Sequence, residues 1–323
     1  MKLLILGAKG MLGQALCRGT NAEVVGWDRS EIDIIDKNQV QEKISALAPD
    51  VIINAAAYNN VDKAEKEDRE LAMKINGEAV GYLAEAAAEI GAIFVHFSSD
   101  YVFKGDNPSG YKEDDVPEPQ SWYAKSKWEG EKHLLSLRGA SEASDEAIPS
   151  LNPKSSARGG RNPKQILNSN FQNLNTKFQI PDTKYYLIRT SRLFGPAGVG
   201  EGAKKSFVDT MLKLGKEEGE LNLIDEEISS PTYVVDLARA TRELIESGAS
   251  SGIYHRTNSG ACTWYGWAKK IFELAGLSVK LNPVLAGKFP RPAVRPKYSK
   301  LLTTKLPPLR KWEEALEEYL KTL

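Results

Sequence analysis

The chain is poor in the residues that build disulfide frameworks, metal sites and histidine-based catalytic centres. Its 323 residues include two cysteines and three histidines. Cys17 and Cys262 lie in different halves without the close spacing of metal ligands, which fits a reducing compartment and argues against a disulfide framework. Because His96, His133 and His255 do not cluster in the sequence, we expect no metal site and no histidine-based triad.

Net charge and long apolar runs are also missing. The 43 basic and 43 acidic residues cancel, so nothing indicates nucleic acid or an anionic membrane as a partner, and a small molecule is expected instead. The apolar run in MKLLILGAKGMLG is too short for a signal peptide or a membrane span, so we expect a cytoplasmic protein. At this length, a hydrophobic content of 41% is enough for one large or two medium domains.

Short apolar runs alternate with helix-length segments through the first half of the chain. The runs KLLILG, AEVVGWD, VIINAAA and AIFVHFSS lack polar alternation, as buried strands of a parallel sheet do. The pattern predicts an α/β fold, namely a Rossmann-type doubly wound parallel sheet with a smaller C-terminal α/β domain. KYYLIRTSRLFG predicts another buried strand, and helices are expected at 206–214, 235–246, 264–275 and 309–319.

A glycine-rich turn follows the first expected strand. Gly7, Gly10 and Gly13 form GxxGxxG at the strand-to-helix turn. Glycines are needed there for a sharp turn, for close approach of a pyrophosphate and for packing of the helix on the strand. The motif predicts dinucleotide binding, and its spacing is typical of short-chain dehydrogenase/reductases.

Asp28 and Arg29 come directly after the second expected strand. A carboxylate at this place binds the hydroxyls of an adenosine ribose, whereas a guanidinium pairs with the 2′-phosphate of NADP. Since both residues are present, NADPH and NADH both stay open, with NADPH favoured.

Further cofactor contacts are expected on either side of the third strand. The carboxylate of Asp33 and the backbone of Ile34 could reach the adenine. The small residues Ala55, Ala56 and Ala57 at the end of VIINAAA would let a cofactor lie against the backbone.

Tyr123 and Lys127, in SWYAKSKWEGEKHLL, lie four residues apart. On a helix this spacing places both side chains on one face, where an ammonium can make a phenol a usable acid. A second match, Tyr265 and Lys269, follows no serine-bearing strand and is interpreted as part of an ordinary amphipathic helix. We therefore take the first pair as the candidate for proton transfer.

The strand AIFVHF ends in Ser98, Ser99 and Asp100. Open α/β sheets place their ligands at this edge, and a hydroxyl there could hold a substrate carbonyl in line with Tyr123. His96 precedes the serines inside the apolar run and is interpreted as a core residue.

The domain prediction combines these motifs with a change in composition. We expect a Rossmann NAD(P)-binding domain at 1–138, continued by 183–189 and parts of 219–246, and a substrate-binding domain at 190–218 and 247–323. Residues 139–182 are rich in Ser, Asn, Pro and Gly and predict an irregular insertion, with a short helix near 165–174. We interpret the insertion as a passive surface loop, with roles in capping the site or in oligomerisation left open.

Taken together, these segments resemble the extended short-chain dehydrogenase/reductases and, within them, the dTDP-4-dehydrorhamnose reductase branch. The likeness spans nearly the whole chain apart from the insertion. The segments that carry it are GAKGMLG, DRSEIDIID, NAAAYNNVDKAE, SSDYVF, YAKSKWEGE, RTSRLFG, SPTYVVDLA, GIYHRTNSGACTWYGWA and FPRPAVRPKYSKL.

The resemblance implies that the 4-keto group of dTDP-4-dehydro-6-deoxy-L-mannose is reduced to dTDP-L-rhamnose, with Tyr123 as the proton donor. Lys127 would stabilise the phenolate and hold the nicotinamide ribose, and Ser99 would bind the carbonyl. Asp100 and Tyr101 would line the sugar pocket, and Arg192 stands where relatives often carry an aromatic residue. Implied cofactor contacts are Gly7, Gly10, Met11, Leu12, Gly13, Asp28, Arg29, Asp33, Ile34, Ala55, Ala56, Ala57, Tyr123 and Lys127.

Other readings stay open on the same scaffold. One is a nucleotide-sugar epimerase or another reductase, and one is a non-catalytic, NADP-binding regulatory subunit. A homodimer is also left open. Magnesium use by some relatives is not carried over, because the sequence has no metal-ligand spacing.

Overall fold

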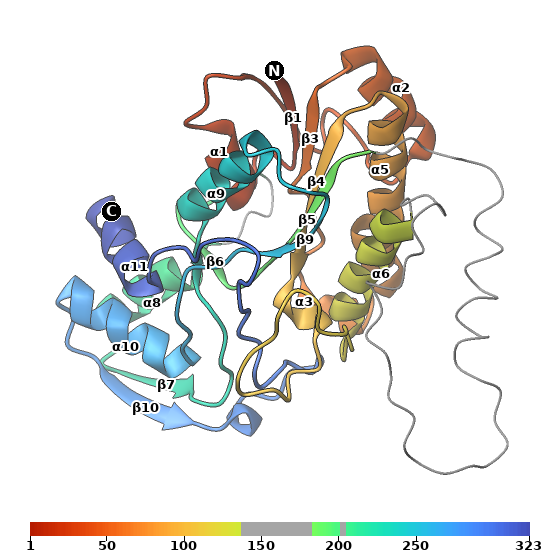
Figure 1. Ribbon diagram of the computed structural model, residues 1–323. Coiled ribbons are helices and arrows are strands. Elements are labelled where there is room, and N and C mark those ends of the chain that lie inside the picture. The colour runs from red at the N-terminus through yellow and green to blue at the C-terminus, as the bar shows by residue number, and fades with distance from the viewer. Residues whose placement is uncertain (137–182, 201–204) are drawn as a thin grey trace, which may run out of the picture.

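A six-stranded parallel sheet forms the centre of the molecule (Figure 1). The computed structural model describes residues 1–136, 183–200 and 205–323. Neighbouring strands follow the order β2-β1-β3-β4-β5-β9, so the chain turns back between β1 and β3, where open sheets of this kind bind ligands. The strands are Lys2–Leu6 (β1), Glu23–Trp27 (β2), Val51–Asn54 (β3), Ile93–Ser99 (β4), Tyr185–Thr190 (β5) and Gly252–His255 (β9).

Helices cover both faces of this sheet. α1 and α9 pack together on one face, and α2, α5 and α6 lie on the other (Figure 1). This arrangement confirms the predicted doubly wound α/β fold. The bounds are Met11–Cys17 (α1), Val234–Glu246 (α9), Lys37–Leu47 (α2), Ala79–Glu89 (α5) and Trp122–Ser136 (α6).

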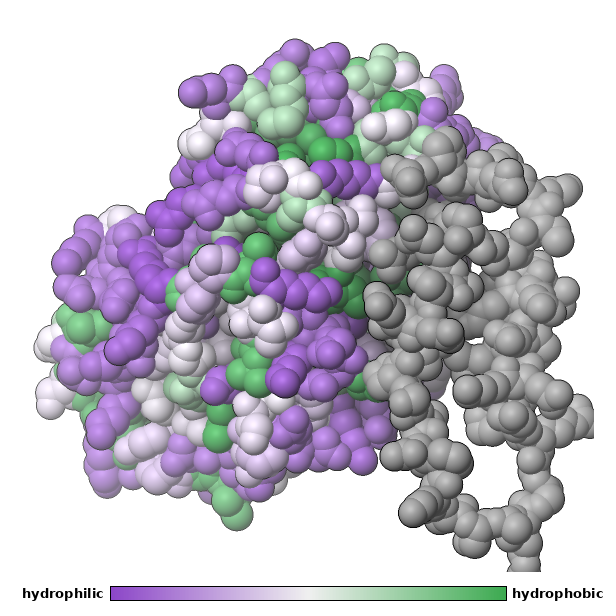
Figure 2. All heavy atoms as spheres, viewed as in Figure 1, coloured by the Kyte–Doolittle hydropathy of each residue, from purple (hydrophilic) through white to green (hydrophobic). Residues whose placement is uncertain are grey.

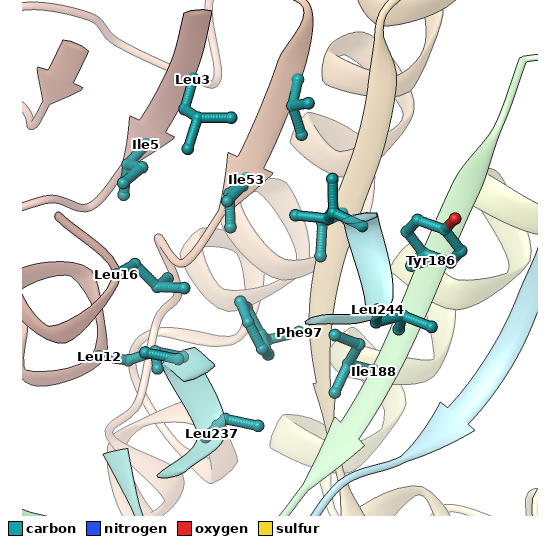
Figure 3. Packing of buried hydrophobic residues seen from close by; sticks show 14 of the residues in the cluster. Leu3, Ile5, Leu12, Leu16, Ile53, Phe97, Tyr186, Ile188, Leu237 and Leu244 are labelled. Carbon is teal, nitrogen blue, oxygen red and sulfur yellow. The ribbon is translucent and has the colours of Figure 1, made fainter. Parts of the chain in front are cut away.

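The strands are apolar on both sides because each face is buried under helices. On one face, Ile5, Ile53 and Phe97 point toward Leu12 of α1 and Leu237 of α9 (Figure 3). The opposite side chains of the same strands pack on α2 and α5 in a second cluster. This two-sided burial explains why the strand sequences show no polar alternation.

Short helical segments connect β3 to α5 and pack against α6. α3 (Val61–Glu65), α4 (Arg69–Met73) and a π-helical turn, η1 (Lys74–Glu78), follow one another along the chain. α6 packs closely on η1, since a Cβ on Gly130 would come within 2.2 Å of the carbonyl oxygen of Asn76. Glycine at this position therefore lets the helix that carries Tyr123 approach η1.

The C-terminal part adds a lobe with its own core. Its centre is a cluster of aromatic side chains that includes Phe194, Trp267 and Tyr319. Two small parallel sheets belong to it, β6 with β8 and β7 with β10. The bounds are Leu193–Phe194 (β6), Phe207–Glu217 (α8), Glu220–Ile224 (β7), Thr232–Tyr233 (β8), Trp264–Ala275 (α10), Lys280–Val284 (β10) and Trp312–Lys321 (α11).

Several boundaries differ from the sequence predictions. β9 at 252–255 is the edge strand of the large sheet, although the predicted boundary assigns 247–323 to the substrate domain. Of 219–246, for which the prediction assigned parts to the Rossmann domain, α9 joins the Rossmann layer and β7 at 220–224 pairs with β10 in the lobe. The last helix begins at Trp312 rather than at 309, because Lys311 is its extended N-cap residue. The insertion and its expected helix near 165–174 lie outside the described residues.

The predicted strand KYYLIRTSRLFG is divided into β5 and β6. The division falls at Ser191 and Arg192, and Arg192 has a φ of 41°, in the left-handed region. The turn lets the chain leave the large sheet and enter the lobe at the edge where the candidate site lies.

Hydrophilic residues dominate the face shown in Figure 2, and apolar residues appear there in small separate areas. Within the described ranges, no helix is long and apolar enough to cross a membrane.

Candidate active site

The carboxyl ends of β4 and β5 bring the predicted site residues together. Ser99 is the last residue of β4 and pairs in register with Thr190 of β5. Its hydroxyl accepts a hydrogen bond from the backbone N–H of Tyr101 at 3.2 Å, in a short 3₁₀ turn, η2 (Asp100–Val102). Strand and turn together hold the Ser99 oxygen at the sheet edge.

Tyr123 reaches this edge from the first turn of α6. Its side chain is 9% exposed, and the ring of Tyr101 contacts it edge-on with centroids 5.8 Å apart. Burial raises the pKa of the Tyr123 phenol above its ordinary value; a hydrogen bond with the Ser99 side chain lowers it, and the nearby Asp100 and Tyr101 raise it further. The phenol is therefore protonated at neutral pH and lies next to the Ser99 hydroxyl.

Lys127 lies one turn further along α6 and is 3% exposed. Its ammonium donates a hydrogen bond to the carbonyl oxygen of Phe97 at 2.7 Å. Burial lowers the pKa of Lys127 to about 8, and the charge of Glu131 opposes this effect. The backbone of β4 thus holds the ammonium in place.

Two buried interactions that the sequence reasoning missed fix the position of α6. Glu131 and Arg189 of β5 form a buried ion pair, with Arg189 Nη2 at 2.7 Å from Glu131 Oε2. Asn76 of η1 donates to Ser126 Oγ at 3.0 Å. Glu131 follows Lys127 by four residues, so the spacing Tyr123, Lys127, Glu131 on one helix face was the signal available in the sequence.

The glycine-rich turn has the close packing that the motif predicts. Gly7 has a φ of 74°, and a Cβ there would lie 2.8 Å from the backbone nitrogen of Ala56. A Cβ on Gly13 would lie 2.0 Å from the carbonyl oxygen of Gly7. Glycine at these positions brings the α1 N-terminus and the end of β3 together, which fits the cradle of a dinucleotide.

A later segment lies on this turn. The backbone N–H of Val199 donates to the carbonyl oxygen of Lys9 at 2.8 Å, and the side-chain amide of Gln14 donates to the carbonyl oxygen of Ala197 at 3.1 Å. A Cβ on Gly198 would be 3.1 Å from the backbone nitrogen of Met11. Residues 197–200 therefore lie against the amide groups that we predicted to contact the cofactor.

Asp28 lies next to the glycine-rich turn, as the sequence predicts for a ribose-binding carboxylate. Its carboxylate accepts hydrogen bonds from the backbone N–H groups of Lys9 at 3.2 Å and Arg29 at 2.8 Å. The ammonium of Lys9 donates to Ser30 Oγ at 3.1 Å. Lys9 and Ser30 are thus additional polar groups at this place, which the sequence reasoning did not single out.

The remaining predicted cofactor residues border the ends of β1 and β3. Asp33 is exposed and accepts a hydrogen bond from the backbone N–H of Ile35. Ile34 packs against the cluster that includes Tyr123. Ala55 donates its backbone N–H to the carbonyl oxygen of Leu6, whereas Ala56 donates to the side chain of Asn54.

Arg192 lies at the turn between β5 and β6. Its guanidinium donates to the carbonyl oxygens of Cys262 at 2.8 Å and Glu227 at 2.7 Å, and stacks on Trp264 at 4.0 Å from the ring centroid. Burial lowers the pKa of Arg192, yet arginine stays charged at neutral pH. A fixed cation thus faces Asp100 and Tyr101. Burial raises the pKa values of both groups, and the charge of Arg192 opposes that rise.

Asp100 is directed into a group of hydroxyls. Its carboxylate accepts hydrogen bonds from Ser99 at 3.1 Å, Ser191 at 3.0 Å and Ser229 at 2.8 Å, and Ser299 also bonds to it. Asp100 is 2% exposed. Burial raises the pKa of the carboxyl group, and the surrounding hydroxyls and Arg192 oppose that rise.

Residues to which the sequence analysis gave structural roles lie outside this group. His96 is buried in β4, where Nδ1 lies 3.1 Å from the side-chain amide of Asn54, and burial lowers the pKa of His96 well below its ordinary value. Tyr265 and Lys269 lie on α10 in the C-terminal lobe. Among the residues that the structure describes, no group of His, Cys, Asp and Glu side chains could hold a metal ion.

Comparisons with known proteins agree with this geometry. The family described as RmlD substrate binding domain matches residues 1–141 and 178–323. The chain is 34% identical to the spore coat polysaccharide biosynthesis protein SpsK of Bacillus subtilis over 99% of this chain and 97% of that protein. It is 32% identical to dTDP-4-dehydrorhamnose reductase of Streptomyces griseus, over 99% of this chain and 93% of that enzyme.

A solved structure gives the same result. It is the dTDP-4-dehydrorhamnose reductase of Bacillus anthracis in complex with NADP, with a TM-score of 0.80 and 33% identity over 100% of this chain and 99% of that one. The sheet order, the glycine-rich turn and the Ser99, Tyr123 and Lys127 group are thus found in a chain that matches such enzymes over nearly its whole length. The chain therefore belongs to the dTDP-4-dehydrorhamnose reductase family of extended short-chain dehydrogenase/reductases.

Proposed function

We propose that the chain reduces the 4-keto group of dTDP-4-dehydro-6-deoxy-L-mannose to give dTDP-L-rhamnose, with NADPH as the reductant. The observation that carries the proposal is the buried contact between Tyr123 and Ser99 at the carboxyl edge of the sheet, beside a glycine cradle for a dinucleotide. The relatives named for this reaction, and the NADP complex among them, support both the substrate class and the cofactor.

Tyr123 supplies the proton in this reaction. A protonated phenol is the form that can give a proton to the oxygen of the reduced carbonyl, and burial keeps Tyr123 in that form. The Ser99 hydroxyl donates a hydrogen bond to the same oxygen and orients the carbonyl. When bound, the nicotinamide supplies the hydride to the carbonyl carbon.

Lys127 stabilises the phenolate that remains after proton transfer. An ammonium on the same helix face lowers the free energy of the anion, and the carbonyl oxygen of Phe97 holds that ammonium in place. In this proposal Lys127 also binds the nicotinamide ribose. Its lowered pKa of about 8 leaves it charged at neutral pH.

Residues at the ends of β1, β2 and β3 would hold the cofactor. Gly7, Gly10 and Gly13 admit the diphosphate, with the backbone of Met11 and Leu12 as donors, since the first N–H groups of a helix have no partner within it. The other residues that would hold the cofactor are Asp28, Arg29, Asp33, Ile34, Ala55, Ala56 and Ala57.

Tyr101 and Arg192 border the sugar. The Arg192 guanidinium is fixed by two backbone carbonyls and by Trp264, so its position is set before the substrate arrives. It takes the place at which relatives often carry an aromatic residue, and its charge can bind a hydroxyl or a diphosphate oxygen. The nucleotide sugar is thus held between this cation and the Tyr123 edge of the sheet.

A turnover assay tests the proposal. The protein is supplied with dTDP-4-dehydro-6-deoxy-L-mannose, and loss of NADPH or NADH absorbance is followed. We expect consumption by the wild type, and a kcat lower by about 100-fold or more in Tyr123→Phe, since a positioned acid contributes roughly that factor. Tyr265→Phe is the matched control and should keep the wild-type rate.

The dissociation constant for NADP⁺ separates the alternatives. Tyr123→Phe should bind NADP⁺ as the wild type does. If the wild type binds NADP⁺ tightly but consumes neither reduced cofactor, the reductase proposal is wrong and a regulatory subunit is favoured.

A further inference from the structure

Asp100 connects segments that are far apart in the sequence. Ser99 ends β4 and Ser191 follows β5, whereas Ser229 and Ser299 belong to loops of the C-terminal part. The hydroxyls of all these serines bond to one carboxylate. The carboxylate thus joins the edge of the large sheet to the C-terminal lobe.

Ser99 is the member of this group that also belongs to the proposed reaction. Its hydroxyl donates to Asp100 Oδ1 and accepts from the backbone N–H of Tyr101, and it lies next to the Tyr123 phenol. A serine hydroxyl has one hydrogen, and while Ser99 donates that hydrogen to Asp100 it cannot donate it to another acceptor. To donate to a substrate carbonyl, Ser99 must turn its hydrogen away from Asp100.

The other hydroxyls keep the free-energy cost of rotating the Ser99 hydroxyl low. Asp100 Oδ2 keeps its bonds to Ser191 and Ser229 when the Ser99 hydrogen leaves Oδ1. A buried carboxylate without partners would be strongly destabilised, whereas this one keeps several donors and the nearby charge of Arg192.

We propose that Asp100 is a positioning residue that fixes the rotamer of Ser99 and releases its hydrogen to the substrate carbonyl, and that it links this placement to the C-terminal lobe. The inference rests on the proposed function for the reaction, but its geometric part stands on the hydrogen bonds alone. Asp100 is 2% exposed, and its proposed effect on the carbonyl passes through Ser99.

Charged and titratable groups face this carboxylate from several elements. They are Arg192 from the turn after β5, Tyr101 on η2 and Tyr123 on α6. Because Arg192 and the hydroxyls oppose the effect of burial, we expect Asp100 to act as a carboxylate acceptor toward Ser99.

Two substitutions at Asp100 test the proposal. Asp100→Asn keeps an acceptor oxygen and nearly the same shape, whereas Asp100→Ala removes the partner of Ser99. We expect kcat to fall about 10-fold in Asp100→Asn and about 100-fold in Asp100→Ala, with the KM for NADPH within about twofold of the wild type. If Asp100 positions Ser99, Asp100→Asn should keep part of the kcat that Asp100→Ala loses, because it keeps an acceptor oxygen.

Ser230→Ala is the matched control for a purely structural effect. Ser230 is a buried neighbour of Ser229, but its hydroxyl donates to the carbonyl oxygen of Gly260 instead of Asp100. The control should lower the melting temperature about as much as Asp100→Asn and leave kcat unchanged. Ser229→Ala, which breaks the link to the lobe, should give a smaller loss of kcat than Asp100→Asn.

Crystal structures of the wild type and Asp100→Ala add a readout that needs no turnover. We expect the Ser99 oxygen to leave its position next to Tyr123 in the variant. An unchanged Ser99 rotamer together with an unchanged kcat would overturn the inference. If the wild type shows no turnover, the reductase proposal fails, while the rotamer comparison still decides whether Asp100 positions Ser99.

Discussion

Single residues at the candidate site are held by specific backbone groups. The ammonium of Lys127 binds a backbone carbonyl, the guanidinium of Arg192 binds two, and the carboxylate of Asp28 accepts from backbone N–H groups. Backbone partners do not change with nearby substitutions, so these charges keep their positions when a ligand enters. This arrangement agrees with a preorganised site, in which little reorganisation accompanies binding or reaction.

The lowered pKa of Lys127 predicts a specific pH dependence of stability. In the folded protein the lysine loses its proton near pH 8, whereas in the unfolded chain it does so near pH 10.4. Between these values the unfolded state binds more protons, so this lysine makes stability rise with pH across that window. The free energy of unfolding rises by at most about 3 kcal/mol across this window, because each unit of pKa difference corresponds to about 1.4 kcal/mol.

Urea unfolding of the wild type and Lys127→Met at pH 7.5 and 9.5 measures this effect. The free energy of unfolding of the wild type should increase relative to that of the variant as pH rises. Comparing the two proteins cancels other groups, such as the Cys262 thiol, whose pKa is raised by burial to about 12. A constant difference between the proteins at both pH values would contradict the prediction.

At the scale of elements, α6 carries the proposed chemistry and is fixed by a buried ion pair. Arg189 is 1% and Glu131 0% exposed, and Arg189 also stacks on Phe103. Removing one partner of such a pair leaves an uncompensated charge and costs roughly 3–5 kcal/mol. Glu131→Gln should therefore destabilise the protein by about that amount in urea unfolding.

A double variant and a surface control make this test specific. Combining Glu131→Leu with Arg189→Met should recover much of the loss, because no unpaired charge stays buried. Glu217→Gln breaks an exposed pair with Lys213 and should change stability by less than about 1 kcal/mol. A loss in Glu131→Gln no larger than in that control would show that the pair does not fix α6.

The segment at 197–200 is a second element with a testable effect. A Cβ on Gly198 would lie 2.7 Å from the carbonyl oxygen of Lys9, so Gly198→Ala must move this segment off the glycine-rich turn. If the segment and the cofactor diphosphate share this place, removing the competing contact should tighten NADP⁺ binding several-fold, by increasing the fraction of competent protein.

Calorimetric titration with NADP⁺ measures the change. Val199→Ala is the matched control, since the Val199 side chain is 73% exposed and only its backbone bonds to Lys9. Weaker binding by Gly198→Ala would instead mean that the segment contributes contacts to the cofactor.

Local patterns identify the elements of this fold well and their long-range partners poorly. The strands, the glycine turn and the Tyr123 helix follow from apolar runs and from residue spacing, which act within a few residues. The serine hydroxyls that bond to Asp100, and the Glu131–Arg189 pair, connect residues far apart in the chain. Residue spacing carries no information about such contacts. The same reason explains the misplaced β9, whose four residues join the large sheet only through the tertiary fold.

For the molecule as a whole, specific polar contacts join the Rossmann layer to the C-terminal lobe beside the site. Apart from Asp100, one link between them is the ion pair of Asp62 on α3 with Arg295, whose Nη1 and Nη2 donate to the carboxylate at 2.6 and 2.7 Å. The backbone N–H of Ala293 donates to the same carboxylate at 3.3 Å. The charge of Arg295 also acts on Tyr101, so this link lies near the proposed sugar pocket.

We expect this ion pair to hold the lobe against α3 while the nucleotide sugar is bound. Asp62→Asn and Arg295→Gln should each raise the KM for the sugar several-fold and leave NADP⁺ affinity unchanged, because the pair lies away from the glycine-rich turn. The double variant should be no worse than the more impaired single one, since both remove the same interaction, and the coupling should be about 1 kcal/mol. Effects that simply add in the double variant would mean that each residue acts separately, and that the lobe is held by other contacts.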